Sequence, residues 1–545
     1  MASRLKMPVV WSLPIAARPD GQPLQHWLYK SLRQAIVTRR ILPDSRMPSS
    51  RRLAGQYRIA RGTVQAVYGK LIAEGYLVSR AGSHTRVCAR LPDVGQLGDV
   101  ADMGALSDRS AGPLVAVPGV AFDAAISAPD RAANDAADAR YAAGAWISRL
   151  AAAAPPFPMQ GTEGRLRAFM PHHGDTRGFP IDTWRAMHVR LLRSSRMPEL
   201  MDADPRGARS LRAAIAGYLR AARGVMVSED EIVVVASVQQ AFDICLRLLT
   251  HADDAVWIEN PGYPGVRQLA QAAGVTVIDV PVDAEGMRVA DGLDRAPDAR
   301  LAYVTPSRHA PLGVPLSPAR CQALLAWAQA RGAFVFEDSY DSDYRYAAPE
   351  VPGVPDAPVL KRMPLGASRV ILAGTFSKLL FPALRIAYVA LPAPLVEPFA
   401  RAASLMARHP NTLAQLSLAH FMMEGHLDQH IRRTRKRYAA RAEAFAHHGR
   451  RLWQGWIEVP AIAAGLDVAV RLGGLGGLGG VDEAATVARL RRAGVDVMPL
   501  GRYAAAGTAL PPGLVMGFAP FDEAEIARAA TVVARALAAG SDVTG

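Results

Sequence analysis

The sequence predicts a multidomain chain, in which a small α+β domain precedes a large α/β domain with a smaller α+β domain at its end. Apolar runs alternate with helical stretches through the second half, which is typical of a sheet with crossover helices. Residues 1–90 hold sixteen lysines and arginines against three acidic residues, whereas the whole chain of 545 residues has a net charge of +14. The segment 89–160 is rich in alanine, aspartate, glycine and proline. We therefore expect domains at 1–88 and 161–545, a flexible linker between them, and a subdomain from about 400 to 545.

The composition narrows the class of protein. Half of the residues are hydrophobic and 21% are charged, which excludes global disorder. A basic N-terminal domain on a nearly neutral body suggests a polyanionic partner. The three cysteines are far apart and lack metal-ligand spacing, which fits a reducing cytoplasm. The apolar run Met7 to Ala17 contains two prolines, and no apolar run approaches the ~18 residues of a membrane span. We expect a cytoplasmic protein without metal.

The N-terminal domain has the pattern of a winged helix-turn-helix. Apolar residues recur every four positions from Leu24 to Ile36, which predicts a helix ending near Arg40. The sequence Met47-Pro48-Ser49-Ser50 predicts a second helix start. A third helix is expected from Arg61 to Glu74, ended by Gly75, with a hairpin over residues 76–87. Such a third helix enters the major groove of DNA.

Segment 48–87 also resembles GntR-family domains. It departs from them at Arg58-Ile59-Ala60, where the family has a turn with Gly-Val. The resemblance implies that residues of the second and third helices and of the wing contact double-stranded DNA. These residues are Ser50, Arg51, Arg52, Arg61, Thr63, Gln65 and His84. For His84, a solvated loop without a DNA contact is an equal alternative.

The α/β domain is predicted from six strand-like runs separated by helical stretches. They are 232–236, 255–259, 275–280, 301–304, 333–337 and 370–373. After the first run, Val238 and Gln239 open a helix whose amides can take a phosphate. After the second, Tyr263 is placed to stack on a ligand ring, or to pack at the surface.

A lysine between two apolar runs carries the main chemical prediction. The run Val370–Ala373 leads through Thr375 and Ser377 to Lys378, and Arg385 precedes the next run. Burial lowers the pKa of a lysine and makes its amine nucleophilic. Two hydroxyls and a guanidinium suit a phosphate dianion. Together they suit pyridoxal 5'-phosphate (PLP), although a stray lysine in a loop is the plainer alternative.

A second segment supports the same chemistry. The apolar strand expected at 333–337 is followed by Asp338 and Tyr340. A carboxylate at the carboxyl end of a strand lies where open α/β sheets bind ligands. It can keep a pyridine nitrogen protonated, and a phenol two residues later can hydrogen-bond the ring oxygen. Taken separately, Asp338 would be read as an ordinary turn aspartate.

Both segments resemble known motifs. GTFSK followed by LRIAY, and EDSYDSDYRY, look like the PLP-binding signatures of fold-type-I aminotransferases, in particular of the MocR/GabR group of transcription regulators, over about 161–540. The resemblance implies that PLP forms a Schiff base with Lys378. Asp338 would pair with the pyridine nitrogen and Tyr340 with the ring oxygen. Thr375, Ser377 and Arg385 would hold the phosphate.

Two functions remain open on the sequence. One is a regulator that senses an amine or amino acid by aldimine exchange at Lys378; the other is an active aminotransferase with an accessory DNA-binding domain. Ordinary aminotransferases have an asparagine where this chain has Ala310, which favours the regulator. Arg502 is a candidate for an effector carboxylate. Arg308 and His309 are either two cations at the site mouth or exposed surface residues. The resemblance implies a homodimer.

Overall fold

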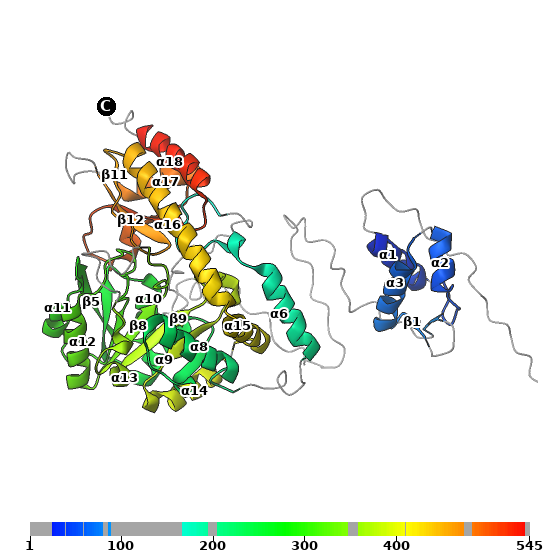
Figure 1. Cartoon of the computed structure of the whole chain (residues 1–545), viewed down its shortest axis with the longest axis horizontal. Coiled ribbons are helices and arrows are strands. Elements are labelled where there is room, and N and C mark those ends of the chain that lie inside the picture. The colour runs from blue at the N-terminus through cyan, green and yellow to red at the C-terminus, as the bar shows by residue number, and fades with distance from the viewer. Residues whose placement is uncertain are drawn as a thin grey trace, which may run out of the picture. The chain divides into compact units, whose positions relative to one another are not determined.

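The computed structural model describes residues 24–38, 40–57, 59–79, 85–88, 166–194, 204–346, 358–408, 410–473 and 482–539. They form two compact units, one before and one after residue 127 (Figure 1). The predicted linker and His84 lie outside the described residues.

The N-terminal unit has the three helices and the hairpin that the sequence predicts. These are α1 (Leu24–Val37), α2 (Ser50–Tyr57), α3 (Arg61–Ala73), β1 (Leu77–Val78) and β2 (Arg86–Val87). The strands pair antiparallel. The apolar stripe of α1 is buried through Leu28, Leu32 and Ile36, against Leu53 of α2 and Val64 of α3. A winged helix-turn-helix is therefore confirmed.

The larger unit is built on a sheet of eight strands in the order β3-β10-β9-β8-β7-β4-β5-β6. The strands are β3 (Ile232–Val235), β4 (Ala255–Asn260), β5 (Thr276–Asp283), β6 (Gly286–Met287), β7 (Leu301–Val304), β8 (Phe334–Ser339), β9 (Val370–Thr375) and β10 (Ala387–Ala390). The neighbours from β9 to β5 are parallel, and β10 runs antiparallel between β3 and β9. All six predicted strands are present. β8 and β9 extend further than predicted, so β8 includes Asp338 and β9 includes Thr375.

Helices cover both faces of this sheet, because successive side chains of a buried strand point to opposite sides. In β3, Val233 and Val235 pack with α9 (Val238–Leu249), α10 (Pro264–Ala273) and α14 (Ala393–Ala407). Ile232 and Val234 pack on the other side. That side is covered by α8 (Arg209–Arg223), α12 (Pro318–Arg331) and α15 (Thr412–Met423), with the short α11 (Val289–Arg295) and α13 (Gly366–Arg369).

A second sheet of four antiparallel strands, in the order β11-β12-β14-β13, forms the smaller subdomain. Its strands are β11 (Ile457–Glu458), β12 (Asp467–Leu472), β13 (Met498–Pro499) and β14 (Gly513–Gly517), with α17 (Glu483–Arg492) and α18 (Glu523–Ala538). The long α16 (His426–Leu452) runs from α15 to α18 (Figure 1). The start of the unit also joins this subdomain, since Phe169 O accepts a hydrogen bond from Gly517 N at 2.8 Å. The sequence did not predict that long-range connection.

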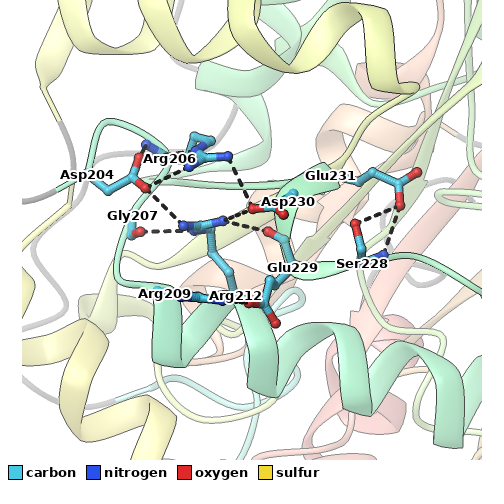
Figure 2. Close-up of polar contacts among 9 residues, drawn as sticks. All are labelled: Asp204, Arg206, Gly207, Arg209, Arg212, Ser228, Glu229, Asp230 and Glu231. Atoms are coloured by element: carbon cyan, nitrogen blue, oxygen red, sulfur yellow. Dashed lines mark hydrogen bonds and ion pairs between the residues drawn. The ribbon is translucent and has the colours of Figure 1, made fainter.

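A buried arginine, Arg212 of α8, fixes the entry to the main sheet (Figure 2). Its guanidinium donates to the Asp204 carboxylate at 2.9 Å, to Gly207 O at 3.1 Å and to Glu229 O at 2.7 Å. Glu229 begins the 3-10 turn that leads directly into β3. The side chain therefore ties the 204–207 turn, α8 and β3 together.

We expect Arg212→Met to lower the free energy of unfolding of this unit by about 1.5–3 kcal/mol, because a carboxylate and two carbonyls lose a charged donor. Calorimetric unfolding of the full chain measures the change. The control is Arg209→Met on the same helix, whose side chain is 82% exposed although it pairs with Glu229. The control should change stability by no more than about 0.5 kcal/mol. Equal losses in both variants would contradict the role given to Arg212.

Candidate functional site

The predicted site residues of the larger unit gather at one edge of the main sheet. Parallel strands bring their carboxyl ends to the same edge, where open α/β sheets bind ligands. The segments that follow β3, β4, β7 and β9 supply Val238 and Gln239, Tyr263, Arg308 and His309, and Lys378, respectively. The last residues of β8 supply Asp338, and Tyr340 directly follows that strand.

Lys378 lies in the turn between β9 and β10. Burial lowers the pKa of its amine, against the opposing effect of the carboxylates of Asp467, Asp341 and Asp338. The Nζ atom donates a hydrogen bond to the carbonyl oxygen of His172. The amine is thus more readily deprotonated than in water, which makes it a nucleophile.

Asp338 is buried at the end of β8, and one of its oxygens has a donor while the other does not. Tyr303 of β7 donates its hydroxyl to Asp338 Oδ2 at 2.5 Å. Asp338 Oδ1 is buried without a hydrogen-bond partner among the described residues. Burial raises the pKa of this carboxyl to about 7. An unpartnered buried carboxylate oxygen is unfavourable, and a ring N–H from a ligand would satisfy it. The residues present therefore fit the pyridine nitrogen of PLP.

Glu259 and His309 are buried next to each other, with His309 Nε2 lying 3.8 Å from Glu259 Oε2. Thr305 donates both its backbone N–H and its hydroxyl to Glu259 Oε2, at 3.0 and 2.7 Å. Burial raises the pKa of Glu259 to about 8, so this carboxyl is protonated at neutral pH. His309 uses both ring nitrogens, one with Pro261 O at 2.9 Å and one with Leu312 N at 3.3 Å.

Two sequence interpretations of the Arg308-His309 pair are corrected here. Burial lowers the pKa of His309 to about 3, so it is a neutral, buried side chain and not a cation at the mouth. Arg308 is also buried, at 6% exposure, so neither residue is exposed surface. The Arg308 guanidinium donates to Tyr340 Oη at 2.7 Å, to Asp341 Oδ2 at 2.9 Å and to Asp467 O at 2.6 Å. An effector role for either residue stays a prediction.

The residues predicted to hold a phosphate surround the turn after β9 and the start of α9. Thr375 Oγ1 accepts from Ser377 N at 3.1 Å, which shapes the turn that leads to Lys378. Ser237 caps α9 by accepting from Gln240 N at 3.1 Å. Arg385 is exposed and in the left-handed backbone region, with φ of 51°. It is close enough to Tyr263 to lower the pKa of that phenol against the larger effect of burial. Their roles toward a phosphate remain predictions.

Sequence reasoning missed three residues, His172, Asp467 and Tyr503, that connect the smaller subdomain to the site. His172 Nδ1 lies 3.0 Å from the carboxylate of Asp467, and its Nε2 contacts the hydroxyl of Tyr503. The His172 imidazole and the Arg308 guanidinium hold the pKa of Asp467 well below its usual range, despite burial. These residues come from three distant segments, and the adjacent pair His172-His173 was the one local signal. Arg502, next to Tyr503, is exposed.

In the N-terminal unit, the predicted DNA contacts lie around the start of α2 and α3. Arg51, Arg52, Arg61 and Gln65 are exposed, and Thr63 is half-buried. Arg61 Nε donates to Ser50 Oγ at 3.3 Å, so the first turns of both helices adjoin. Each of these first turns lacks an acidic residue. This surface is a positively charged candidate nucleic-acid interface.

Comparisons with known proteins agree with both units. Residues 24–87 match the model of the bacterial regulatory proteins of the GntR family, and residues 174–510 match that of aminotransferase class I and II. The structure of the α-aminoadipate aminotransferase LysN from Thermus thermophilus has a TM-score of 0.62 at 23% identity, covering 69% of this chain and 93% of that one. The multiple substrate aminotransferase from Thermococcus profundus also has a TM-score of 0.62, at 23% identity, over 73% and 98% of the two chains. The larger unit has the aminotransferase fold.

Curated relatives share the whole domain arrangement. The probable rhizopine catabolism regulatory protein MocR of Rhizobium meliloti is 31% identical over 93% of this chain and 92% of its own length. The pyridoxine biosynthesis regulator PdxR of Corynebacterium glutamicum is 30% identical over 94% and 95%. The chain is thus an HTH-type transcriptional regulator with an aminotransferase-like domain, and it belongs to the MocR-type group.

The raised pKa of Glu259 predicts a pH-dependent stability. The pKa of a glutamate carboxyl is ordinarily 4.5 and that of Glu259 in the folded chain is about 8, so between these values the folded chain keeps a proton that the unfolded chain loses. Stability therefore falls as pH rises, by about 1.4 kcal/mol per pH unit for one proton. We expect Glu259→Gln to remove this one-proton contribution to the slope, because an amide does not titrate. The amide oxygen can still accept from Thr305, so the fold should be retained.

Urea unfolding of parent and variant between pH 5 and pH 8 measures the difference between the two slopes. The control is Glu443→Gln, which changes an exposed residue of α16 and should leave the slope of the parent intact. A stability difference between parent and Glu259→Gln that stays constant across this range would contradict the prediction.

Proposed function

We propose that the chain regulates transcription through PLP: it holds the cofactor at Lys378, senses an amine or amino-acid effector there, and binds operator DNA through its N-terminal unit. The observation that carries the proposal is the pairing of a partly buried, nucleophilic Lys378 with Asp338 Oδ1, which has no partner among the described residues, at one sheet edge. A lysine for the aldehyde and a carboxylate for the ring nitrogen are the two groups that PLP requires of a protein.

The other residues would orient the cofactor. Tyr303 fixes the Asp338 carboxylate by occupying Oδ2, which leaves Oδ1 for a ring N–H. Arg308 donates to the Tyr340 oxygen, so the Tyr340 hydroxyl keeps its own proton to donate to a ring oxygen. The phosphate would be held by Thr375, Ser377, Arg385 and the amides of Val238 and Gln239, with Tyr263 against the ring.

When bound, PLP supplies an aldehyde that condenses with primary amines. An effector amine would compete with Lys378 for that aldehyde, and the released lysine would change its contacts with the His172 segment. Such a contact difference is what a ligand needs to shift a conformational equilibrium. Of the three predicted effector contacts, Arg502 is the exposed one, which suits it best to an incoming carboxylate.

The alternative function, an active aminotransferase, is favoured by the fold but not by Ala310. The backbone N–H of Ala310 donates to Thr305 Oγ1 at 3.1 Å, and its methyl group offers no hydrogen bond to a cofactor ring. Turnover near the ~10 per second of typical enzymes, with an amino donor and a keto acid, would favour the enzyme.

We further infer a homodimer, because two reading heads match a two-fold symmetric operator.

We expect borohydride reduction in the presence of PLP to fix the cofactor on Lys378, as located by peptide mapping. Lys361 is a matched internal control, because it is buried and its pKa is likewise lowered by burial, to about 8. Its Nζ is committed to Val370 O at 2.8 Å, so it should remain unlabelled. Reducible cofactor retained by Lys378→Ala would contradict the assignment.

For DNA binding, we expect Arg61→Ala to relax sequence preference and to cost about 1–3 kcal/mol on the operator, because this side chain is placed to read base edges. Arg52→Ala should instead weaken all duplexes alike and reduce the salt slope by about 0.9. Titrations of the promoter region and of an unrelated duplex at several salt concentrations separate the two effects. Loss of the same affinity on both duplexes in Arg61→Ala would exclude a base contact.

A further inference from the structure

A second cavity lies between the first turns of α6 (Ile181–Ser194) and α16, apart from the residues assigned to PLP. Its volume is about 80 Å³. It is lined by Gly178, Pro180, Thr183, His426, Gln429, His430, Arg433 and Arg437. One water requires about 10–15 Å³ on this measure, so the cavity has room for several water-sized atoms.

The lining is positively charged. It contains two arginines and two histidines but no aspartate or glutamate. Arg437 is half-buried and reaches Asp175 at 3.5 Å, whereas Arg433 is exposed and has no hydrogen-bond or ion-pair partner among the described residues. The pKa of His430 is lowered, first by burial and further by Arg437 and Arg433, so these cations lie within electrostatic reach of one another. These cations would attract an anion into the cavity.

The N-termini of two helices add to the positive electrostatic potential of the cavity. Thr183 belongs to the first turn of α6, and His426 and Gln429 belong to the first turn of α16. The N–H groups of a first turn lack intrahelical acceptors and favour anions. Each first turn also carries an aspartate, but neither lines the cavity: Asp182 pairs with Arg185 at 2.8 Å, and Asp428 lines a separate apolar groove.

We propose that this cavity binds a small oxyanion of the size of phosphate, held by Arg433, Arg437 and the first turns of α6 and α16. The cavity also adjoins the main site. His430 Nε2 lies 2.9 Å from Leu379 O, and Leu379 directly follows Lys378. The site goes beyond the proposed cofactor function and rests on residues that take no part in it.

The test is calorimetric titration of the full chain, saturated with PLP, with inorganic phosphate at fixed ionic strength. Saturation occupies the proposed cofactor phosphate site. We expect one phosphate per chain in this cavity, and we expect Arg433→Gln to weaken it by about tenfold or more, as for loss of a charged hydrogen bond. The matched control is Arg432→Gln, which alters an exposed neighbour on α16 that does not line the cavity and should leave the affinity unchanged.

Thr183→Val provides a second variant, with a smaller expected loss of about two- to tenfold for a neutral hydroxyl. Sulfate should compete with phosphate, because both are tetrahedral oxyanions. Equal phosphate affinity in the parent and Arg433→Gln, or no binding heat in the parent, would overturn the proposal. The phosphate titrations of Arg433→Gln and Arg432→Gln are repeated in PLP-free protein. They show whether Arg433 binds phosphate independently of PLP, so a failure of this proposal is distinguished from a failure of the cofactor proposal.

Discussion

The ion pair between Arg308 and Asp467 is the interaction on which the site depends. Arg308 follows β7 of the main sheet, and Asp467 begins β12 of the smaller subdomain. The same carboxylate also binds His172, whose carbonyl oxygen receives the Lys378 amine. One buried acid therefore joins two subdomains and a third segment that contacts Lys378. Each ion of such a group costs several kcal/mol to bury, so the arrangement requires all partners in place.

The sequence predicted the parts of this site that depend on local patterns. Strand ends could be located from apolar runs, and Asp338 and Lys378 followed from their positions after such runs. The burial of Arg308 could not be predicted, because it depends on Gly465, which is more than 150 residues away. A Cβ atom on Gly465 would come within 2.3 Å of the Arg308 guanidinium carbon, so the arginine occupies space that a glycine leaves open.

His172 illustrates the same limit. Nothing near it in the sequence distinguishes a partly buried site residue from an exposed histidine in a loop. Its partners, Asp467 and Tyr503, lie 295 and 331 residues further along the chain. Local periodicity carries no information about contacts at such separations. In the N-terminal unit, by contrast, the contacts are short-range, and the helix boundaries agree with the predicted ones to within a few residues.

The charges around Lys378 suggest why a cofactor site can serve as a sensor. One buried oxygen of Asp338 has no donor in the part of the chain that the structure describes, and burial disfavours the charged forms of both Asp338 and Lys378. An unsatisfied buried group of this kind costs about 1–3 kcal/mol in the folded chain. A ligand that brought a ring N–H would remove that cost. The free energy gained by satisfying this oxygen would then add to the ligand's binding free energy. Because the same ligand would engage Lys378, its arrival would change the contact of Lys378 with the His172 carbonyl oxygen. His172 also binds Asp467, so the contact between the subdomains would feel that change. With both effects, ligand binding would stabilise the fold and alter a subdomain contact, which are the two properties that a ligand-controlled switch needs.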